Sequence, residues 1–377
     1  MAYLGESVKK LGFGLMRLPQ DPPGVVDIPQ FERMADEFIE AGFTYFDTAY
    51  GYINGESEKA AGRALVARYP RDKFTLATKL PAWAGANSKE EAQQMLFTSL
   101  ERTGAGYFDF YLLHNIGAAR TAKFDEYDIW NFVWEQKARG LIKHAGFSFH
   151  DNAELLDEVL TKHPETEFVQ LQINWADWEA GAVQSRLCYE TAWLKHKKPI
   201  VIMEPIKGGM LANPAPSVKA VFDEADSGGA SYASWSIRYA ASLPGVIAVL
   251  SGMSDLAQMR DNISYMKDFK PLDDKERATI SKAQAALAAL PSVPCTSCKY
   301  CVPECPQGIG IPGIFDSMNR ELVYGDVAAA RQGYTFETTF FGSALASSCV
   351  QCGSCEAVCP QKIKIIDSLK LAASKYE

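Results

Sequence analysis

A single run of cysteines sets the character of the C-terminal part of the chain: Cys349-Val-Gln-Cys352-Gly-Ser-Cys355-Glu-Ala-Val-Cys359-Pro360. The same C-x2-C-x2-C-x3-C-P spacing occurs once earlier, in Cys295-Thr-Ser-Cys298-Lys-Tyr-Cys301-Val-Pro-Glu-Cys305-Pro306. Three thiolates at this spacing can point inward from one tight loop, and the proline turns the fourth cysteine away from it. Eight of the nine cysteines lie in these two runs, so the thiolates are concentrated in one segment.

This spacing predicts iron–sulfur ligands, because C-x2-C-x2-C-x3-C-P is the run that wraps a [4Fe–4S] cluster in bacterial ferredoxins. A structural zinc site is the alternative, although zinc motifs usually separate two C-x2-C pairs. Disulfides are disfavoured in so long a chain without an export signal. In two-cluster ferredoxins the fourth cysteine of each run ligates the other cluster. On that pattern we expect two clusters, with the ligand sets Cys295, Cys298, Cys301, Cys359 and Cys349, Cys352, Cys355, Cys305.

Length and composition are those of a globular protein with a sizeable core. The chain has 377 residues, of which 47% are hydrophobic and 22% charged, enough for one large domain and a small one. A net charge of −8 without a Lys/Arg cluster argues against a nucleic-acid partner. The first residues contain no apolar signal segment, and no run of about 18 apolar residues occurs. We therefore expect a cytoplasmic protein with no membrane partner.

Apolar strand-like runs alternate with amphipathic helical patterns from residue 28 to about residue 266. Asp27, Ser57, Ser88 and Asn152 are predicted to cap four of these helices, and Glu91 would complete a capping box with Ser88. Eight buried strands that alternate with helices favour a closed (β/α)8 barrel. An open doubly wound sheet is the alternative, but no G-x-G-x-x-G follows the first strand. The expected strands cover residues 11–18, 44–48, 74–80, 108–114, 144–148, 168–174, 200–203 and 246–250.

Cysteine usage and helical periodicity suggest three parts. We expect a barrel over residues 1–269, a helix and linker over 270–294, and an iron–sulfur domain over 295–377. About forty residues separate the two cysteine runs, and they include predicted helices at 312–323 and 326–332. The second domain is therefore predicted to be small and mostly helical.

Four polar residues occur where the early strands end. Asp47 ends the second strand, Lys79 the third and His114 the fourth, while Tyr52 follows on the loop after the second. Chemistry in such barrels gathers at the carboxyl ends of the strands. Tyrosine is a poor acid at neutral pH, but a neighbouring ammonium lowers its pKa and a carboxylate holds that ammonium in place. Each residue alone has an ordinary structural explanation, whereas four at successive strand ends favour acid catalysis.

Several motifs in order resemble the aldo/keto reductase superfamily over about residues 9–266: Phe46-Asp47-Thr-Ala-Tyr-Gly-Tyr52, Ser57-Glu58, Thr78-Lys79-Leu80, Leu112-Leu113-His114, Gly146-Phe147-Ser148 and Val169-Gln170-Leu-Gln172. The whole chain resembles the subgroup that carries a C-terminal iron–sulfur domain. The resemblance implies a catalytic tetrad of Asp47, Tyr52, Lys79 and His114. Tyr52 matches rather than Tyr50, because the tyrosine of the family lies five residues after its aspartate.

The resemblance also implies NAD(P)H across the barrel mouth, bound without a Rossmann domain. Ser148 and Gln170 occupy positions that hold the carboxamide in relatives. The positions near the pyrophosphate and adenosine would be Lys207, Gly208, Gly209, Leu211, Gly252, Ser254, Gln258 and Asn262. Basic residues that grip a 2′-phosphate are not evident in this set, so the choice between NAD and NADP stays open.

The main functional hypothesis is an oxidoreductase in which Tyr52 acts as general acid on a carbonyl, coupled to electron transfer through the clusters. A plain NAD(P)H carbonyl reductase with structural clusters is one alternative, and a catalytically silent redox sensor or binding module is another. The expected partners are a small carbonyl or alcohol substrate and a ferredoxin- or flavodoxin-type electron donor. Trp83, Asn115, Trp175 and Trp178 either line a substrate pocket or pack the barrel rim.

Overall fold

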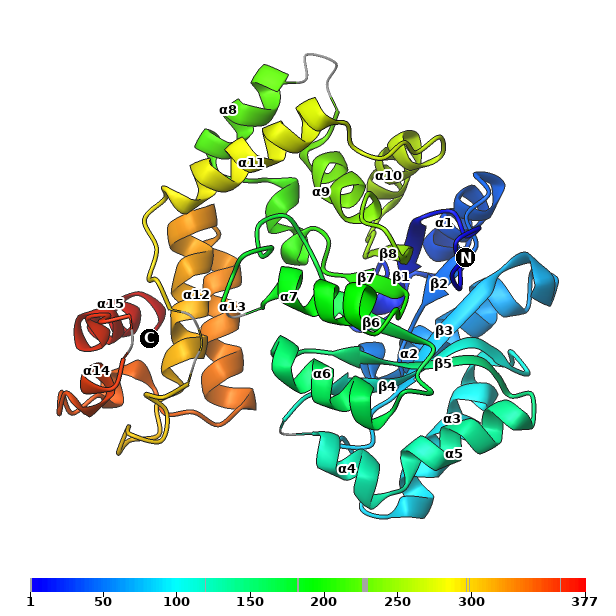
Figure 1. The fold of residues 1–377 in the computed structure, drawn as a ribbon, viewed down its shortest axis with the longest axis horizontal. Helices are drawn as coiled ribbons and strands as arrows, with labels where there is room; N and C mark the ends of the chain where they lie inside the picture. The colour runs from blue at the N-terminus through cyan, green and yellow to red at the C-terminus, as the bar shows by residue number, and fades with distance from the viewer. Residues whose placement is uncertain are drawn as a thin grey trace. The chain divides into compact units, whose positions relative to one another are not determined.

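Eight strands of the computed structural model close into one barrel (Figure 1). Each strand pairs in parallel with its sequence neighbour, and β1 pairs with β8, which confirms the predicted (β/α)8 barrel. The strands are β1 Leu11–Gly14, β2 Tyr45–Asp47, β3 Thr75–Leu80, β4 Phe108–Ile116, β5 Ile142–Phe149, β6 Phe168–Gln172, β7 Ile200–Met203 and β8 Val246–Ser251.

The structure describes residues 2–118, 120–181, 183–225, 230–295, 297, 299–359 and 361–377. The predicted ligand Cys298 lies outside these ranges. The chain forms two compact units. The first contains Met1–Trp178, Val183–Gly209 and Ala233–Asp274, and the second contains Glu179–Ala182, Met210–Tyr232 and Lys275–Glu377.

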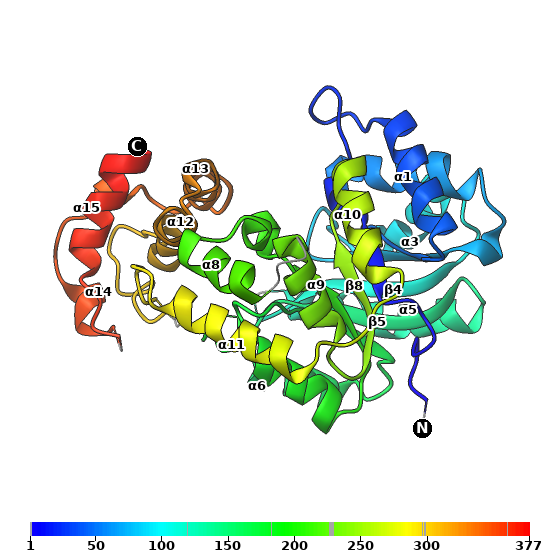
Figure 2. The same cartoon turned by 90° about the horizontal axis from the view of Figure 1, so that it is seen from above.

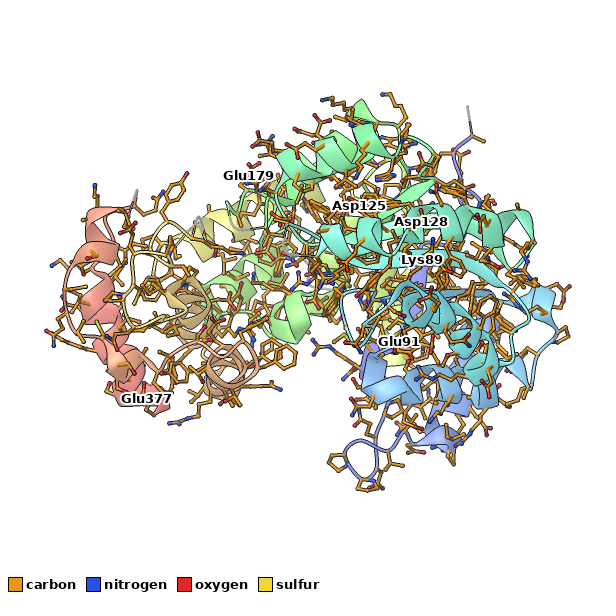
Figure 3. All side chains as sticks on the ribbon, turned by 90° about the horizontal axis from the view of Figure 1, so that it is seen from below. Lys89, Glu91, Asp125, Asp128, Glu179 and Glu377 are labelled. Carbon is orange, nitrogen blue, oxygen red and sulfur yellow. The ribbon has the colours of Figure 1, made fainter. Side chains whose placement is uncertain are left out.

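Helices connect the strands of the barrel. Their bounds are α1 Ile28–Glu40, α2 Glu56–Ala61, α3 Lys89–Thr103, α4 Thr121–Glu126, α5 Ile129–Ala138, α6 Ala153–Lys162, α7 Ser185–Tyr189, α9 Tyr232–Ala241 and α10 Leu256–Met266. Three predicted caps are confirmed, because the side chains of Asp27, Ser88 and Asn152 accept backbone N–H bonds three residues ahead. α3 is further joined to α5 by the exposed ion pair between Lys89 and Asp128, both labelled in Figure 3.

Three local predictions are wrong. The first strand ends at Gly14, where the chain turns into a 3₁₀ helix over Leu15–Arg17. Ser57 does not cap a helix; it lies inside α2, where its hydroxyl donates to the carbonyl of Leu15 and is therefore used in packing. The carboxylate of Glu91 accepts the N–H of Asn87 rather than that of Ser88, so the capping box is incomplete.

The interior of the barrel is a packed apolar core below its carboxyl end. Its members are inward-facing side chains of several strands: Tyr45, Ala77, Phe110, Leu112, Phe168, Val201, Ile247, Ala248 and Leu250. Successive residues of a strand point to opposite faces, so residues two positions further on point into the barrel one layer higher. That next layer begins the candidate site described below.

The second unit is mostly helical (Figure 2), and this includes residues 295–377, for which a mostly helical domain was predicted. Its helices are α8 Pro216–Ala225, α11 Asp274–Ala288, α12 Ile311–Tyr324, α13 Val327–Thr335, α14 Ser354–Ala357 and α15 Ile365–Tyr376. Its core includes the buried side chains of Ile314, Phe315 and Leu369. Polar contacts tie α15 to α12, because Lys375 and Tyr376 both donate to the carboxylate of Glu321. Among the described helices, none is long and apolar enough to cross a membrane.

Candidate functional site

The layer above the apolar barrel core is polar. Asp47 lies two residues after Tyr45, Lys79 two after Ala77, and His114 two after Leu112, so the strand period points them inward together. Tyr52 joins them from the 3₁₀ turn Tyr52–Gly55, which follows β2. The structure therefore brings the four residues of the predicted tetrad to one place.

Lys79 is the centre of this group. Its ammonium donates to Oδ1 of Asp47 at 2.5 Å and to the carbonyl of Thr48 at 2.8 Å. The same nitrogen lies 4.9 Å from the ring centroid of Tyr52. The side chain is only 1% exposed, so this charge is held in a site of low dielectric. The ring of His114 lies 5.9 Å from that of Tyr52, in an edge-on arrangement.

The protonation states follow from burial and from Lys79. Burial raises the pKa of Tyr52 above 10.0, and the ammonium of Lys79 offsets only part of that rise. Burial alone would lower the pKa of Lys79, but Asp47 and Tyr52 raise it, which keeps the ammonium charged. Burial, followed by the charge of Lys79, lowers the pKa of His114 well below 6.5, so the imidazole is neutral. The site holds a protonated phenol, a cation and a neutral imidazole.

A buried ion pair supports the turn that carries Tyr52. The carboxylate of Glu58 is fully buried and accepts from Arg102 at 3.0 Å and from Thr78 at 2.7 Å. Arg102 also donates to the carbonyl of Tyr50 at 2.9 Å, and its guanidinium lies over the ring of that tyrosine. Tyr50 therefore packs against Arg102, whereas Tyr52 is the tyrosine whose ring contacts Lys79.

Two predicted carboxamide-binding residues lie in the described barrel close to its polar layer. Gln170 is 1% exposed on β6, and its Oε1 is a buried acceptor with no partner among the described residues. Ser148 on β5 accepts from the N–H of Asn115 at 2.8 Å and keeps its hydroxyl proton. An unsatisfied buried amide oxygen is unusual. It fits a ligand that donates an N–H, such as the carboxamide of a nicotinamide.

The loop after β7 carries three residues predicted to lie near the pyrophosphate: Lys207, Gly208 and Gly209. Lys207 makes a contact that the prediction did not include. Its ammonium pairs with Asp177 at 2.5 Å, so its charge is used within the protein. Gly208 and Gly209 both have positive φ values, 66° and 104°, which glycine tolerates best. Leu211 is buried and belongs to the second unit.

Arg17 is a basic residue of this site that motif matching missed. It ends the 3₁₀ turn after β1, and its guanidinium donates to the carbonyl of Gly208 at 3.3 Å and lies 4.0 Å from the carboxylate of Glu204. Its aliphatic stem passes Gly252, where an added Cβ would lie 3.4 Å from the stem. Its position could have indicated its role, because Arg17 is a basic residue just after the carboxyl end of the first strand, where the site lies.

The predicted adenosine-side residues are divided between surface and interior. The N–H of Ser254 bonds to Oε1 of Gln258 at 2.9 Å, on the exposed start of α10. Asn262 is buried, with its amide nitrogen donating to the carbonyl of Gln258 and its oxygen accepting from Tyr265. Its polar atoms are thus already paired, so in this geometry Asn262 shapes the helix rather than facing outward.

Two hollows in the second unit are lined by the cysteines. The first is lined by Cys305 from the early run together with Cys349, Cys352 and Cys355 from the late run. The second is lined by Cys295, Cys301 and Cys359. In each hollow the fourth cysteine of one run meets the other run. No disulfide joins one described cysteine to another.

The chemistry of these hollows suits an iron–sulfur cluster. Thiolate is the ligand for such clusters, and most of the remaining lining is apolar, with Ile311 shared by both hollows. Between the described side chains, no three ligand residues converge tightly enough to hold one metal ion. Cys188, the ninth cysteine, is buried elsewhere, and burial raises the pKa of its thiol to about 12. It is therefore an inert structural residue.

Sequence comparison identifies both parts of the chain. The profile of the aldo/keto reductase family matches residues 10–285, and that of a 4Fe-4S dicluster domain matches residues 294–364. An aldo-keto reductase of Mycolicibacterium smegmatis is 35% identical over 125 residues, which are 33% of this chain and 41% of that protein. This chain spans between 41% and 62% of the length of four such curated relatives.

Solved structures agree on the fold. An aldo-keto reductase of Bacillus halodurans in its holo form superposes with a TM-score of 0.58 at 25% identity, over 75% of this chain and 95% of that one. An aldo-keto reductase of Klebsiella pneumoniae in complex with NADPH gives a TM-score of 0.58 at 20% identity, over 73% and 90% of the two chains.

The barrel, its polar layer and the profile match together define the class: this chain belongs to the aldo/keto reductase family. It carries in addition a C-terminal 4Fe-4S domain, so the predicted subgroup is confirmed and zinc is set aside. The prediction of an oxidoreductase agrees with this family.

Proposed function

We propose that this chain reduces a carbonyl compound, or oxidises the corresponding alcohol, with Tyr52 as the proton donor. The observation that supports this most is the arrangement around Lys79, whose ammonium bonds to Asp47 and lies 4.9 Å from the ring centroid of Tyr52. A protonated phenol beside a fixed cation can give its proton to a developing alkoxide, because the cation stabilises the phenolate left behind. The neutral ring of His114 orients the carbonyl by donating an N–H.

The hydride donor is proposed to be NAD(P)H. A nicotinamide would supply the hydride when bound, and residues of this chain would hold it. Oε1 of Gln170 and the hydroxyl of Ser148 would bind the carboxamide, and Arg17 would meet a phosphate near the Gly208-Gly209 turn. Arg17 is half exposed and its carboxylate neighbour is at 4.0 Å, so its guanidinium can still donate hydrogen bonds to an anionic ligand.

The second unit is proposed to hold two clusters with crossed ligands. Cys305, Cys349, Cys352 and Cys355 would hold one, and Cys295, Cys298, Cys301 and Cys359 the other. [4Fe–4S] clusters supply one-electron transfer when bound. A small ferredoxin- or flavodoxin-type protein is the expected donor, and the cytoplasm the expected compartment.

Two neighbouring tyrosines test the proton-donor assignment. Tyr52→Phe should lower kcat for NADPH- or NADH-dependent reduction of benzaldehyde by about 10²–10⁴-fold, the usual contribution of a positioned acid. The dissociation constant of the cofactor, measured by fluorescence titration of the anaerobically purified protein, should stay unchanged. Tyr50→Phe is the matched control, because the contact of Tyr50 with Arg102 is made by its ring, which phenylalanine keeps.

Equal activity of Tyr52→Phe and the native protein would refute the assignment. Loss of activity in both tyrosine variants would instead indicate that the turn itself had been disturbed.

A further inference from the structure

The loop after β4 places an arginine beside the tetrad. Nη1 of Arg120 donates to Oδ1 of Asn115 at 3.2 Å, and the guanidinium lies 5.1 Å from the ring centroid of Trp83. The hydrogen bond to Asn115 and the contact with the ring of Trp83 together restrain the guanidinium of Arg120. Long side chains at a loop normally lose rotamer entropy when they bind a ligand, and this one is already restrained.

Both contacts of Arg120 connect it to the catalytic layer. The indole of Trp83 donates to the carbonyl of His114 at 2.7 Å, and its ring lies 6.4 Å from the imidazole. Asn115 directly follows His114, and its N–H bonds to Ser148. Asn115 has a φ of +63°, which turns the chain sharply at the strand end and which asparagine tolerates better than most residues. Successive contacts therefore link Tyr52 to His114, His114 to Trp83, and Trp83 to Arg120.

The charge of Arg120 is not neutralised locally. Within the described ranges no carboxylate lies within ion-pair distance of it, whereas Asp47 is committed to Lys79. A guanidinium has five N–H donors in a planar fork, of which one is used here on Asn115. This fork matches a carboxylate in a two-bond geometry. The apolar ring of Trp83 contacts both this guanidinium and the imidazole of His114.

We propose that Arg120 is a specificity-determining residue that binds a carboxylate of the substrate. The substrate class is then a carbonyl compound that carries a carboxylate at the opposite end of a flat or apolar body. The carbonyl lies at Tyr52 and His114, the body against Trp83, and the carboxylate at Arg120. This inference rests on the proposed function, since the same tetrad acts on the carbonyl end.

A pair of aldehydes that differ only in the carboxylate tests the inference. The full-length protein should have a higher kcat/KM for 4-carboxybenzaldehyde than for benzaldehyde. Arg120→Met should lower the value for 4-carboxybenzaldehyde by about 10–100-fold, which corresponds to a lost charged hydrogen bond, and leave benzaldehyde unchanged. Arg120→Lys should recover only part of the loss, because an ammonium lacks the planar fork. Arg139→Met is the control, since Arg139 is exposed at the end of α5 and bonds to Gln136.

A binding measurement separates this inference from the proposed function. Titration with terephthalate, which carries carboxylates and no reducible group, should quench tryptophan fluorescence in the native protein and not in Arg120→Met. Quenching without reduction of either aldehyde would uphold the role of Arg120 while refuting the tetrad chemistry. Equal quenching in both proteins, or an equal loss of activity on both aldehydes in Arg120→Met, would overturn the inference and leave the proposed function standing.

Discussion

Tyr52 must be protonated to act as an acid, and its surroundings decide the pH at which that holds. Burial raises its pKa above 10.0, while Lys79 works in the opposite direction. A raised pKa means that the proton is present at every pH below it and is lost only as the pH rises through it. His114 has the opposite shift, so its ring is neutral at every pH above its ordinary value of 6.5.

The first prediction is a pH profile. kcat/KM for benzaldehyde reduction should not titrate between pH 6.5 and 10.0, and it should fall only as Tyr52 ionises above that range. In Lys79→Met the falling limb should move to still higher pH, because the offsetting charge has gone and Asp47 remains. Initial rates in a constant-ionic-strength buffer series measure this. A limb inside the window in the native protein would show that Lys79 outweighs burial once cofactor is bound.

Arg17 gives a second prediction at the scale of the residue. Arg17→Ala should weaken binding of NADPH and NADH by about tenfold or more, because a charged hydrogen bond to phosphate is lost. Fluorescence titration measures the dissociation constants. Arg260→Ala removes an exposed guanidinium that pairs with Glu37 and should change neither constant. Unchanged binding in Arg17→Ala would place the phosphates elsewhere.

At the scale of the element, the turn after β2 depends on a support that its own sequence does not contain. Ile53 and Asn54 have positive φ values of 50° and 54°, a strained conformation for non-glycine residues. The carbonyl of Tyr50 is held by Arg102 from α3, and Glu58 from α2 holds Arg102. The position of Tyr52 is thus set by contacts between three elements.

The third prediction is that Arg102→Met lowers the free energy of unfolding by about 3 kcal/mol or more, since it leaves the buried carboxylate of Glu58 without its charge partner. Lys89→Ala breaks the exposed pair with Asp128 and should have little effect. Anaerobic urea unfolding followed by circular dichroism measures both. Similar small changes in the two variants would mean that Thr78 alone satisfies Glu58.

At the scale of the whole molecule, the second unit is organised by pairing between distant cysteine runs. Cys305 and Cys349 are separated by α12 and α13, yet they line the same hollow. The apolar contacts of Ile314, Phe315 and Leu369 build the core next to both hollows. A helical core therefore fixes which thiolates can share a cluster.

The fourth prediction follows from that pairing. The native protein should contain about eight iron atoms per chain, and Cys305→Ala combined with Cys349→Ala should retain about four, because both residues serve one cluster. Cys359→Ala combined with Cys349→Ala should lose both clusters. Anaerobic iron and sulfide analysis with EPR provides the measurement, and Cys188→Ala is the control. Loss of all iron in the first double variant would indicate that each run holds its own cluster.

Local patterns in the sequence were sufficient for most of the barrel strands, for three helix caps and for the strand-end positions of Asp47, Lys79 and His114. The alternation of side chains along a strand and the capping of a helix both depend on residues close in the chain. They can therefore be predicted from the local sequence. Ser57 shows the limit of this approach, since its hydroxyl is used by Leu15, forty-two residues earlier, instead of by its own helix.

The sequence by itself indicated the barrel strands, the polar residues at their ends and the two groups of thiolates, because periodicity and spacing express short-range chemistry. Only the tertiary structure decided that Lys207 is neutralised by Asp177, that Arg17 lies beside the Gly208-Gly209 turn, and that Arg120 lies beside Asn115 and Trp83. Those facts depend on packing between elements that are far apart in the chain, and packing is set by the shapes and burial of many side chains at once.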